Sequence, residues 1–335
     1  MKQIYGIPTV CLCAAILAAC GNSTMPTSGP TSAALIARLR SPADARRAAT
    51  GTTLYVANRL LSTVTAYAGG KTLLRTISQG VSYPSGLAID SSGRLYVANS
   101  GTVTVYADRG KKLVRTISRG VHTPTAVALD TSSYLYLACQ FAVQVYAPGK
   151  KSVLRTIRVQ HPFSLAFDAS GDLYVGNSNT VTVYAPGSTS PMLTISQGVD
   201  YAVALAFDAS GNLYVANSYG GTVTVYAPGS TSVLRTISQD VLFPDALAFD
   251  NSGDLYVANE DSSNVTVYAP GSGSVLRAIS QEVDYPDALA FDGSGNLYVA
   301  NYHGANVTVY APGSMSVLRT ISRGVSDPQA LAFGP

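Results

Sequence analysis

The residues best suited to chemistry in this 335-residue chain are charged and imidazole side chains in its loops. Carboxylates and histidines can act as general acids or bases, hold a metal ion, or pair with a charged ligand. They form one acidic group and one basic group. The acidic group contains Asp240, Asp245, Glu260, Asp261, Glu282, Asp284 and Asp287; the basic group contains Arg59, Arg119, His122, Arg158 and His161; Tyr302 and His303 adjoin in a further loop.

None of the local patterns amounts to a catalytic or metal site. The turn at 168–172 has the Asp and Gly of a calcium loop but lacks its alternating acidic ligands and final Glu. We interpret it as a tight turn, in which Asp168 bonds to the backbone and Gly171 takes a positive φ. Cys139 and His161 could form a thiol–imidazole pair, but a lone buried thiol is more often inert packing. The sequence therefore predicts no catalytic residue, no metal ligand and no cofactor.

The loops separate the copies of a repeat. Each copy continues from Leu-Tyr-Val-Ala-Asn through Thr-Val-Thr-Val-Tyr, an Ala-Pro-Gly turn and Val-Leu-Arg-Thr-Ile to a Pro-containing loop and Ala-Leu-Ala-Phe-Asp. Short alternating runs of β-branched and aromatic residues, bounded by Gly, Pro and Asn, are strand signals. The first segment, or a close variant, begins at Leu54, Leu95, Leu135, Leu173, Leu213, Leu255 and Leu297, at intervals of 38 to 42 residues.

Four strands in a repeat of about 40 residues predict one blade of a β-propeller. The expected fold class is all-β, a seven-bladed β-propeller with four antiparallel strands per blade. The repeated region begins with a second strand at Leu54 and ends with an inner strand at 330–333. The C-terminal strand should therefore join the N-terminal blade and close the ring, which leaves no unpaired seam.

Recurrent polar residues are expected to serve this architecture. The repeated Tyr rings should lie between blades, with their hydroxyls on polar partners. The Arg of each outer strand should have a structural role, because charge on an edge strand discourages pairing with another molecule. The Asn that ends each second strand, as at Asn217, is interpreted as a turn former.

The charged loop residues are expected to share one face of the ring. In a propeller, the loops that enter the inner strands and those between the second and third strands lie at the same end. We place all acidic candidates in loops, and expect the face to be acidic over one sector and basic over another. The alternative is ordinary solvated loop charge. The predicted partner-binding face contains Arg59, Arg119, His122, Arg158, His161, Asp245, Glu260, Asp261, Asp284, Asp287, Tyr302 and His303.

The N-terminal segment is typical of an export signal. Its apolar run at 7–19 is too short to span a bilayer, which takes about 20 residues, and fits a secretory signal. It ends in Leu-Ala-Ala-Cys20, which resembles a bacterial lipoprotein lipobox. The resemblance implies lipid attachment at Cys20 and a location in the bacterial cell envelope, facing the periplasm or exterior. The expected divisions are a signal peptide at 1–19, a lipidated N-terminus and linker at 20–50, and the propeller at 51–335.

The repeats, as at 208–217 (Asp-Ala-Ser-Gly-Asn-Leu-Tyr-Val-Ala-Asn), resemble the NHL and YVTN propeller repeats of bacterial surface proteins over residues 51–335. The resemblance implies the propeller fold. A rigid ring with varied loops, a lipid anchor and no convergent catalytic set leads us to expect a membrane-anchored module that binds a protein, peptide or glycan through its loop-rich face. Two alternatives stay open: a metal-dependent lactonase- or lyase-like enzyme with a site at the channel mouth, and a purely structural surface protein. A net charge of +3, from 22 basic and 19 acidic residues, excludes an electrostatic nucleic-acid binder.

Overall fold

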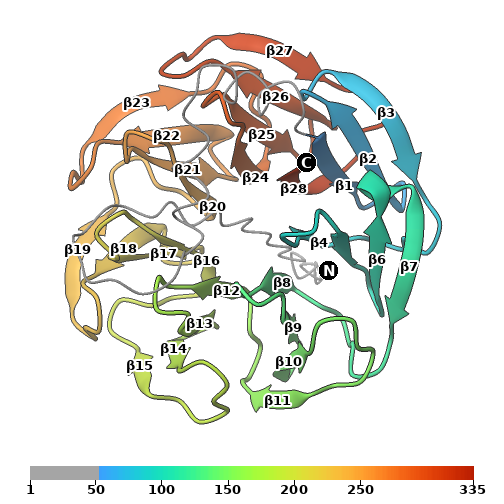
Figure 1. Ribbon diagram of the computed structural model, residues 1–335. Helices are drawn as coiled ribbons and strands as arrows, with labels where there is room; N and C mark the ends of the chain where they lie inside the picture. Colours follow the sequence, from blue (N-terminus) through green and yellow to red (C-terminus); the bar gives the residue numbers. More distant parts are fainter. Residues whose placement is uncertain (1–52) are drawn as a thin grey trace, which may run out of the picture.

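The computed structural model describes residues 53–335, which form a ring of seven four-stranded antiparallel sheets around a central channel (Figure 1). This confirms the seven-bladed all-β prediction. The expected signal peptide (1–19), Cys20 and the whole of the expected linker (20–50) lie outside the described residues. Within 53–335, no helix is long and apolar enough to cross a membrane.

Each blade runs from an inner strand at the channel to an outer strand at the rim. Blade 1 contains β28 (Pro328–Gly334), β1 (Thr53–Asn58), β2 (Thr63–Ala68) and β3 (Thr72–Ile77). Blade 2 contains β4 (Gly86–Ile89), β5 (Leu95–Ala98), β6 (Val103–Ala107) and β7 (Lys112–Ile117), with a 3₁₀ turn, η1 (Asp108–Gly110), before β7. Blade 3 contains β8 (Ala126–Leu129), β9 (Leu135–Cys139), β10 (Ala142–Tyr146) and β11 (Arg155–Arg158).

The remaining four blades follow the same order. Blade 4 contains β12 (Ser164–Phe167), β13 (Leu173–Gly176), β14 (Val181–Tyr184) and β15 (Leu193–Ile195). Blade 5 contains β16 (Ala202–Phe207), β17 (Leu213–Asn217), β18 (Thr222–Tyr226) and β19 (Val233–Ile237). Blade 6 contains β20 (Pro244–Phe249), β21 (Leu255–Asn259), β22 (Asn264–Tyr268) and β23 (Val275–Ile279). Blade 7 contains β24 (Pro286–Phe291), β25 (Leu297–Asn301), β26 (Asn306–Tyr310) and β27 (Val317–Ile321).

The C-terminal strand closes the ring, as the repeat order predicts. Strand β28 pairs antiparallel with β1 and places Leu331 opposite Val56 and Phe333 opposite Leu54. Both strands are almost wholly buried. Blade 1 is therefore assembled from the two ends of the described chain, and β1 is not left with an unpaired edge.

Tyrosines join the blades, as expected. The Tyr of each third strand is buried, and in six blades its hydroxyl reaches a backbone carbonyl in the loop that arrives from the preceding blade. For example, Tyr226 donates to the carbonyl of Gln197 over 2.6 Å. A buried hydroxyl with a partner costs little to desolvate, so these rings can bury large areas between sheets.

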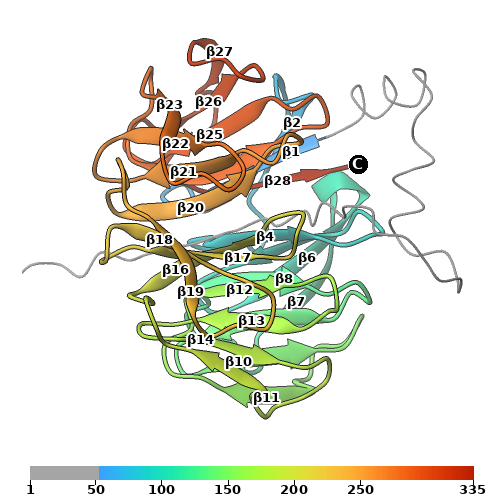
Figure 2. The same cartoon turned by 90° about the vertical axis from the view of Figure 1, so that its left-hand side faces the viewer.

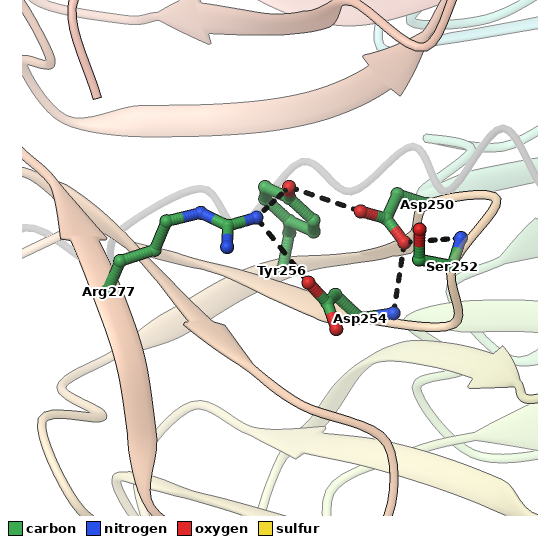
Figure 3. Close-up of polar contacts among 5 residues, drawn as sticks. All are labelled: Asp250, Ser252, Asp254, Tyr256 and Arg277. Carbon is green, nitrogen blue, oxygen red and sulfur yellow. Dashed lines mark hydrogen bonds and ion pairs between the residues drawn. The ribbon is translucent and has the colours of Figure 1, made fainter. Parts of the chain in front are cut away.

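The Asp turn and the outer-strand Arg form one polar unit in blade 6 (Figure 3). The carboxylate of Asp250 accepts the backbone N–H groups of Ser252 and Asp254, and Gly253 has a φ of 83°, which confirms the tight-turn interpretation. Arg277 donates to the Tyr256 hydroxyl over 2.6 Å and pairs with Asp254 over 3.5 Å. The Arg is thus structural, as predicted, but it acts by holding this tyrosine as well as by charging the rim.

The Asn at the end of the second strand does more than the predicted turn-forming. Asn217 is fully buried, donates to the Thr224 hydroxyl over 3.0 Å, and accepts the N–H of Asp200 from the preceding loop. The equivalent residues Asn58, Asn99, Asn259 and Asn301 make the same two kinds of bond. Five of these Asn residues are therefore clamps between a blade and the loop entering it. In blade 4, the side chain of Asn177 bonds only within its own turn.

Candidate functional site

Two sets of loops form one face of the ring, as expected. We call the loop that precedes an inner strand an entry loop and the loop between the second and third strands a middle loop. Seen from the side (Figure 2), the strands run between the two faces, so these loops gather at the same end. At blade 5, Tyr201 donates its N–H to Ser178 in the neighbouring middle loop over 2.6 Å. Its carbonyl accepts the N–H of Ser218 over 3.1 Å. We call this surface the loop face.

Every entry loop ends in a residue with left-handed backbone. Six of these seven residues precede Pro, a context that disfavours helical backbone. The left-handed conformation costs an L-residue with a side chain roughly 1–2 kcal/mol. Such strain recurs at ligand-contacting sites, where the surrounding structure enforces it. Five of the seven are aromatic or His, so the ring presents flat side chains on the loop face. The seven residues are Tyr83, Thr123, His161, Tyr201, Phe243, Tyr285 and Asp327, with φ between 40° and 63°.

An aromatic row crosses the loop face from blade 4 to blade 6. The ring centroids of Phe163 and Tyr201 are 4.2 Å apart, and Tyr219 stacks on Tyr201 at 4.2 Å with 26° between the planes. Phe243 follows at 6.2 Å from Tyr219, edge to face. Tyr219 is 51% exposed in spite of these contacts. A contiguous set of partly exposed rings is a feature of binding surfaces rather than of solvated loops.

A second aromatic group lies on blade 7. His303 lies between Tyr285, 4.0 Å away by ring centroids, and Tyr302, 4.8 Å away. The N–H of Tyr302 donates to the carbonyl of Tyr285 over 2.9 Å. The structure therefore brings the predicted pair Tyr302 and His303 together with Tyr285, which the sequence did not single out.

Asp245 and Asp287 are not in loops, which corrects the sequence prediction. They are the second residues of inner strands β20 and β24 and are skipped in the pairing register, as is Gln329 in β28. Such β-bulges re-aim a side chain and interrupt the simple alternation of the strand. All three side chains are buried, at 3%, 7% and 2% exposure, respectively.

The bulge residues form a hydrogen-bonded chain across three blades. Gln329 donates from Nε2 to Asp287 over 2.5 Å and to Asp327 over 2.8 Å. The carboxyls of Asp245 and Asp287 also share a hydrogen bond. Two carboxyl groups can bond only if one of them carries a proton, so this pair holds a proton between blades 6 and 7. Asp245 Oδ1 keeps no hydrogen-bond partner.

Burial drives the acid–base behaviour of this group. Desolvation, reinforced by the Glu260 charge, raises the pKa of Asp245 to about 7. Desolvation and the neighbouring Asp245 carboxyl raise the pKa of Asp287 well above its usual value. The pKa of Glu260 is also raised, first by burial and then by Asp261. Four carboxyls of blades 6 and 7 thus form one electrostatic unit.

The basic candidates lie on the same face. Arg119, His122, Arg158 and His161 are exposed in the loops around blades 3 and 4, across the ring from the acidic residues of blades 6 and 7, and the His161 ring contacts Phe141 at 5.5 Å. Arg59 differs, because its N–H bonds the carbonyl of Asp327 over 3.0 Å. Its charge lowers the pKa of Asp327, although desolvation by burial prevails and leaves that pKa raised.

Cys139 is an inert packing residue, as interpreted. It occupies the place of the Asn clamp in blade 3, is 3% exposed, and donates weakly to the carbonyl of Gly120 over 3.8 Å. Burial raises the pKa of its thiol, which opposes thiolate formation. Within residues 53–335, no three or more His, Cys, Asp or Glu side chains are grouped so that they could hold a metal ion.

Comparison with known proteins supports the fold. No protein-family model and no curated protein sequence matches the chain. The fold is similar to that of a functionally unknown protein from Desulfotomaculum acetoxidans DSM 771, with a TM-score of 0.68 and 16% identity over 84% of this chain and 98% of that one. It is also similar to Kuenenia stuttgartiensis hydrazine synthase, with a TM-score of 0.67 and 18% identity over 79% and 93% of the two chains. The chain is therefore a seven-bladed β-propeller, and at these identities the likeness shows the fold alone.

The sequence contained a signal for the residues that were overlooked. Each entry loop has a Pro, or Ala202 in blade 5, and the residue before it is Tyr, Phe or His in five copies. The residue after this Pro is Asp245 in blade 6, Asp287 in blade 7 and Gln329 in blade 1, which are the three bulge residues. Aligning the copies on this Pro would have separated Tyr201, Phe243, Tyr285 and Gln329 from the general set of loop residues.

Proposed function

We propose that this propeller is a binding module whose loop face holds a protein, peptide or glycan. The observation that carries the proposal is the aromatic row of Phe163, Tyr201, Tyr219 and Phe243. These rings come from four separate loops or strand starts around blades 4 to 6, which fixes their spacing by the rigid sheets beneath them. Rigid aromatic side chains give a large contact area at low entropic cost.

The burial of the bulge carboxyls Asp245 and Asp287 also favours a binding surface over an enzyme site. A channel-mouth enzyme using Asp245 and Asp287 would have to bring substrate to side chains that are 3% and 7% exposed. The aromatic row, by contrast, is open to a large ligand as it stands. A flat ligand face or an extended chain can lie on such a row without a conformational change.

An array of peptides and glycans tests this function. The full-length chain should give discrete signals, and Tyr219→Ala should reduce them because a central exposed ring is lost. Leu276→Ala is a matched control, since Leu276 is 52% exposed on the outer strand β23 and away from the loop face. Signals that Leu276→Ala reduces as strongly as Tyr219→Ala, or a complete lack of signals, would contradict the proposal.

We further propose that the chain carries NHL/YVTN-type repeats and is attached to a bacterial envelope membrane through Cys20. Support comes from the repeat sequence at 208–217 and from the lipobox-like Leu-Ala-Ala-Cys20 after an apolar run. Several acyl chains anchor a protein stably, whereas one binds only marginally. Cys20→Ser should therefore move the protein from the membrane to the soluble fraction in cell fractionation; retention of the variant on membranes would refute this anchor.

A further inference from the structure

We propose that the loop face between blades 6 and 7 binds a cationic peptide segment, with a Lys or Arg side chain held between aromatic rings and carboxylates. This rests on the proposed binding function and specifies its ligand class. The site is formed by Glu260 and Asp284, with Tyr285, Tyr302 and His303 as the aromatic wall.

The geometry brings these groups together from two contacting loops. The N–H of Tyr285 donates to the hydroxyl of Ser263 over 3.2 Å, which joins the entry loop of blade 7 to the middle loop of blade 6. Glu260 begins that middle loop and is electrostatically coupled to His303, whose ring contacts Tyr285 and Tyr302. Glu260 and Asp284 are partly exposed, so a ligand can reach both.

The negative charge of this sector has no cation to balance it. Its entry and middle loops, at 196–201, 238–243, 260–263, 280–285 and 302–305, contain six Asp and Glu residues and no Lys or Arg, and the strand bulges add Asp245 and Asp287. The two ion pairs of the described chain, Arg94–Asp90 and Arg277–Asp254, both lie at turns on the opposite face. An external cation would therefore supply the missing charge.

An unpartnered buried oxygen points to the same conclusion. Asp245, whose pKa the Glu260 charge helps to raise, is 3% exposed and keeps Oδ1 without a hydrogen-bond partner. A buried acceptor without a partner is costly, and a bound positive charge nearby lowers that cost. Aromatic faces beside carboxylates provide the combination that holds ammonium and guanidinium groups.

Backbone strain singles out two of the acids. The third residue of the entry loops is Gly at Gly80, Gly120, Gly198 and Gly324, all with positive φ. The loops entering blades 6 and 7 place Asp240 and Glu282 there instead, with φ of 54° and 55°. These two acids add negative charge to the sector, and Glu282 also accepts the Thr320 hydroxyl over 2.6 Å.

Fluorescence anisotropy with the full-length chain tests the inference, using a fluorescein-labelled hexalysine peptide and its fully acetylated form. Hexalysine should bind at least about tenfold more tightly than the acetylated peptide, and more weakly at high salt, because the attraction is between charges. Glu260→Gln/Asp284→Asn should raise the Kd of hexalysine about tenfold. Tyr302→Ala, which leaves every charge in place, should raise it about threefold through the lost cation–π contact.

Asp172→Asn is the control for removal of charge alone. Asp172 lies at the turn of the opposite face, and Asn already occupies its position at Asn212 and Asn296. It should leave the Kd unchanged, and unchanged thermal unfolding of the double variant shows that the fold persists. Equal binding of the acetylated peptide, or an unchanged Kd in the double variant, would overturn the inference.

A neutral hexasaccharide separates the two proposals. Suppose that the hexasaccharide binds, that Tyr219→Ala weakens this binding, and that hexalysine does not bind. The loop face is then a binding face but not one for cationic peptides. If neither probe binds and the arrays give no signal, both the inference and the proposed function fail.

Discussion

At the scale of single residues, the unusual feature is a proton held between two blades. Asp245 and Asp287 are buried, are bonded to one another, and are surrounded by Glu260 and Asp327. Gln329 adds a neutral donor to Asp287 and Asp327. Burial and the neighbouring charges favour the protonated carboxyls, so we expect the contact between blades 6 and 7 to be sensitive to pH.

The sign of this pH dependence follows from the raised pKa values. The folded state keeps protons that the unfolded state loses above pH about 4, so stability falls as the pH rises toward about 7, the pKa of Asp245. Asp287→Asn keeps a neutral donor and removes one ionisable group. We expect the wild type to lose at least about 1 kcal/mol of unfolding free energy between pH 5 and 8, and the variant distinctly less.

Urea unfolding at several pH values measures this difference. Asp245→Asn should flatten the profile in the same way, because either substitution leaves a single carboxyl with an amide partner. Parallel profiles for the wild type and both variants would show that the pair does not hold the proton.

At the scale of elements, the second strand of each blade is tied to the loop that enters that blade. The Asn clamp is buried at the end of the strand. Its side-chain amide donates to a Thr hydroxyl and its side-chain carbonyl accepts a loop N–H, as Asn217 does with Thr224 and Asp200. The loop face thus rests on the sheets through polar contacts that hold the entry loops in place.

Asn217→Ala should cost about 2–3 kcal/mol of unfolding free energy, since it leaves the buried Thr224 hydroxyl and the Asp200 N–H without these partners. Asn177→Ala is a matched control, because Asn177 is partly exposed and bonds only within its own turn. We expect it to cost about 1 kcal/mol or less in the same chemical denaturation measurement. Equal losses would mean that the clamp across blades contributes nothing beyond a turn.

At the scale of the whole molecule, β28 closes the ring by joining the last blade to the first. Strand β28 pairs with β1 and packs against inner strands of blades 7 and 2. Figure 1 shows the C-terminal strand completing the blade that begins with β1. The last strand therefore secures three neighbouring sheets.

Deletion of residues 328–335 should abolish the single cooperative unfolding transition and promote aggregation, because it exposes the edge of β1. Deletion of the exposed Pro335 alone is the control and should change stability by less than about 0.5 kcal/mol. Calorimetry measures both. A sharp, unshifted transition after the longer deletion would contradict the role of β28 in closure.

Much of the fold could be predicted because local sequence patterns specify its strands and turns. The alternation at Leu54 and its six counterparts, and the Asp–Gly turns, specify strands and hairpins without reference to distant residues. The site was only partly predictable. Asp245 and Asp287 were recognised as candidates but placed in loops, because a bulge adds a residue without changing the local pattern.

Sequence alone determined the number of blades, their strand order and the closure by the last strand, because periodicity and turn chemistry act over a few residues. Only the tertiary structure decided that Asp245 meets Asp287, that Gln329 bridges to Asp327, and that Tyr285 joins His303. These contacts join residues of neighbouring loops and blades, and they depend on how bulged strands and left-handed loop ends direct side chains toward one another. No local pattern encodes that direction.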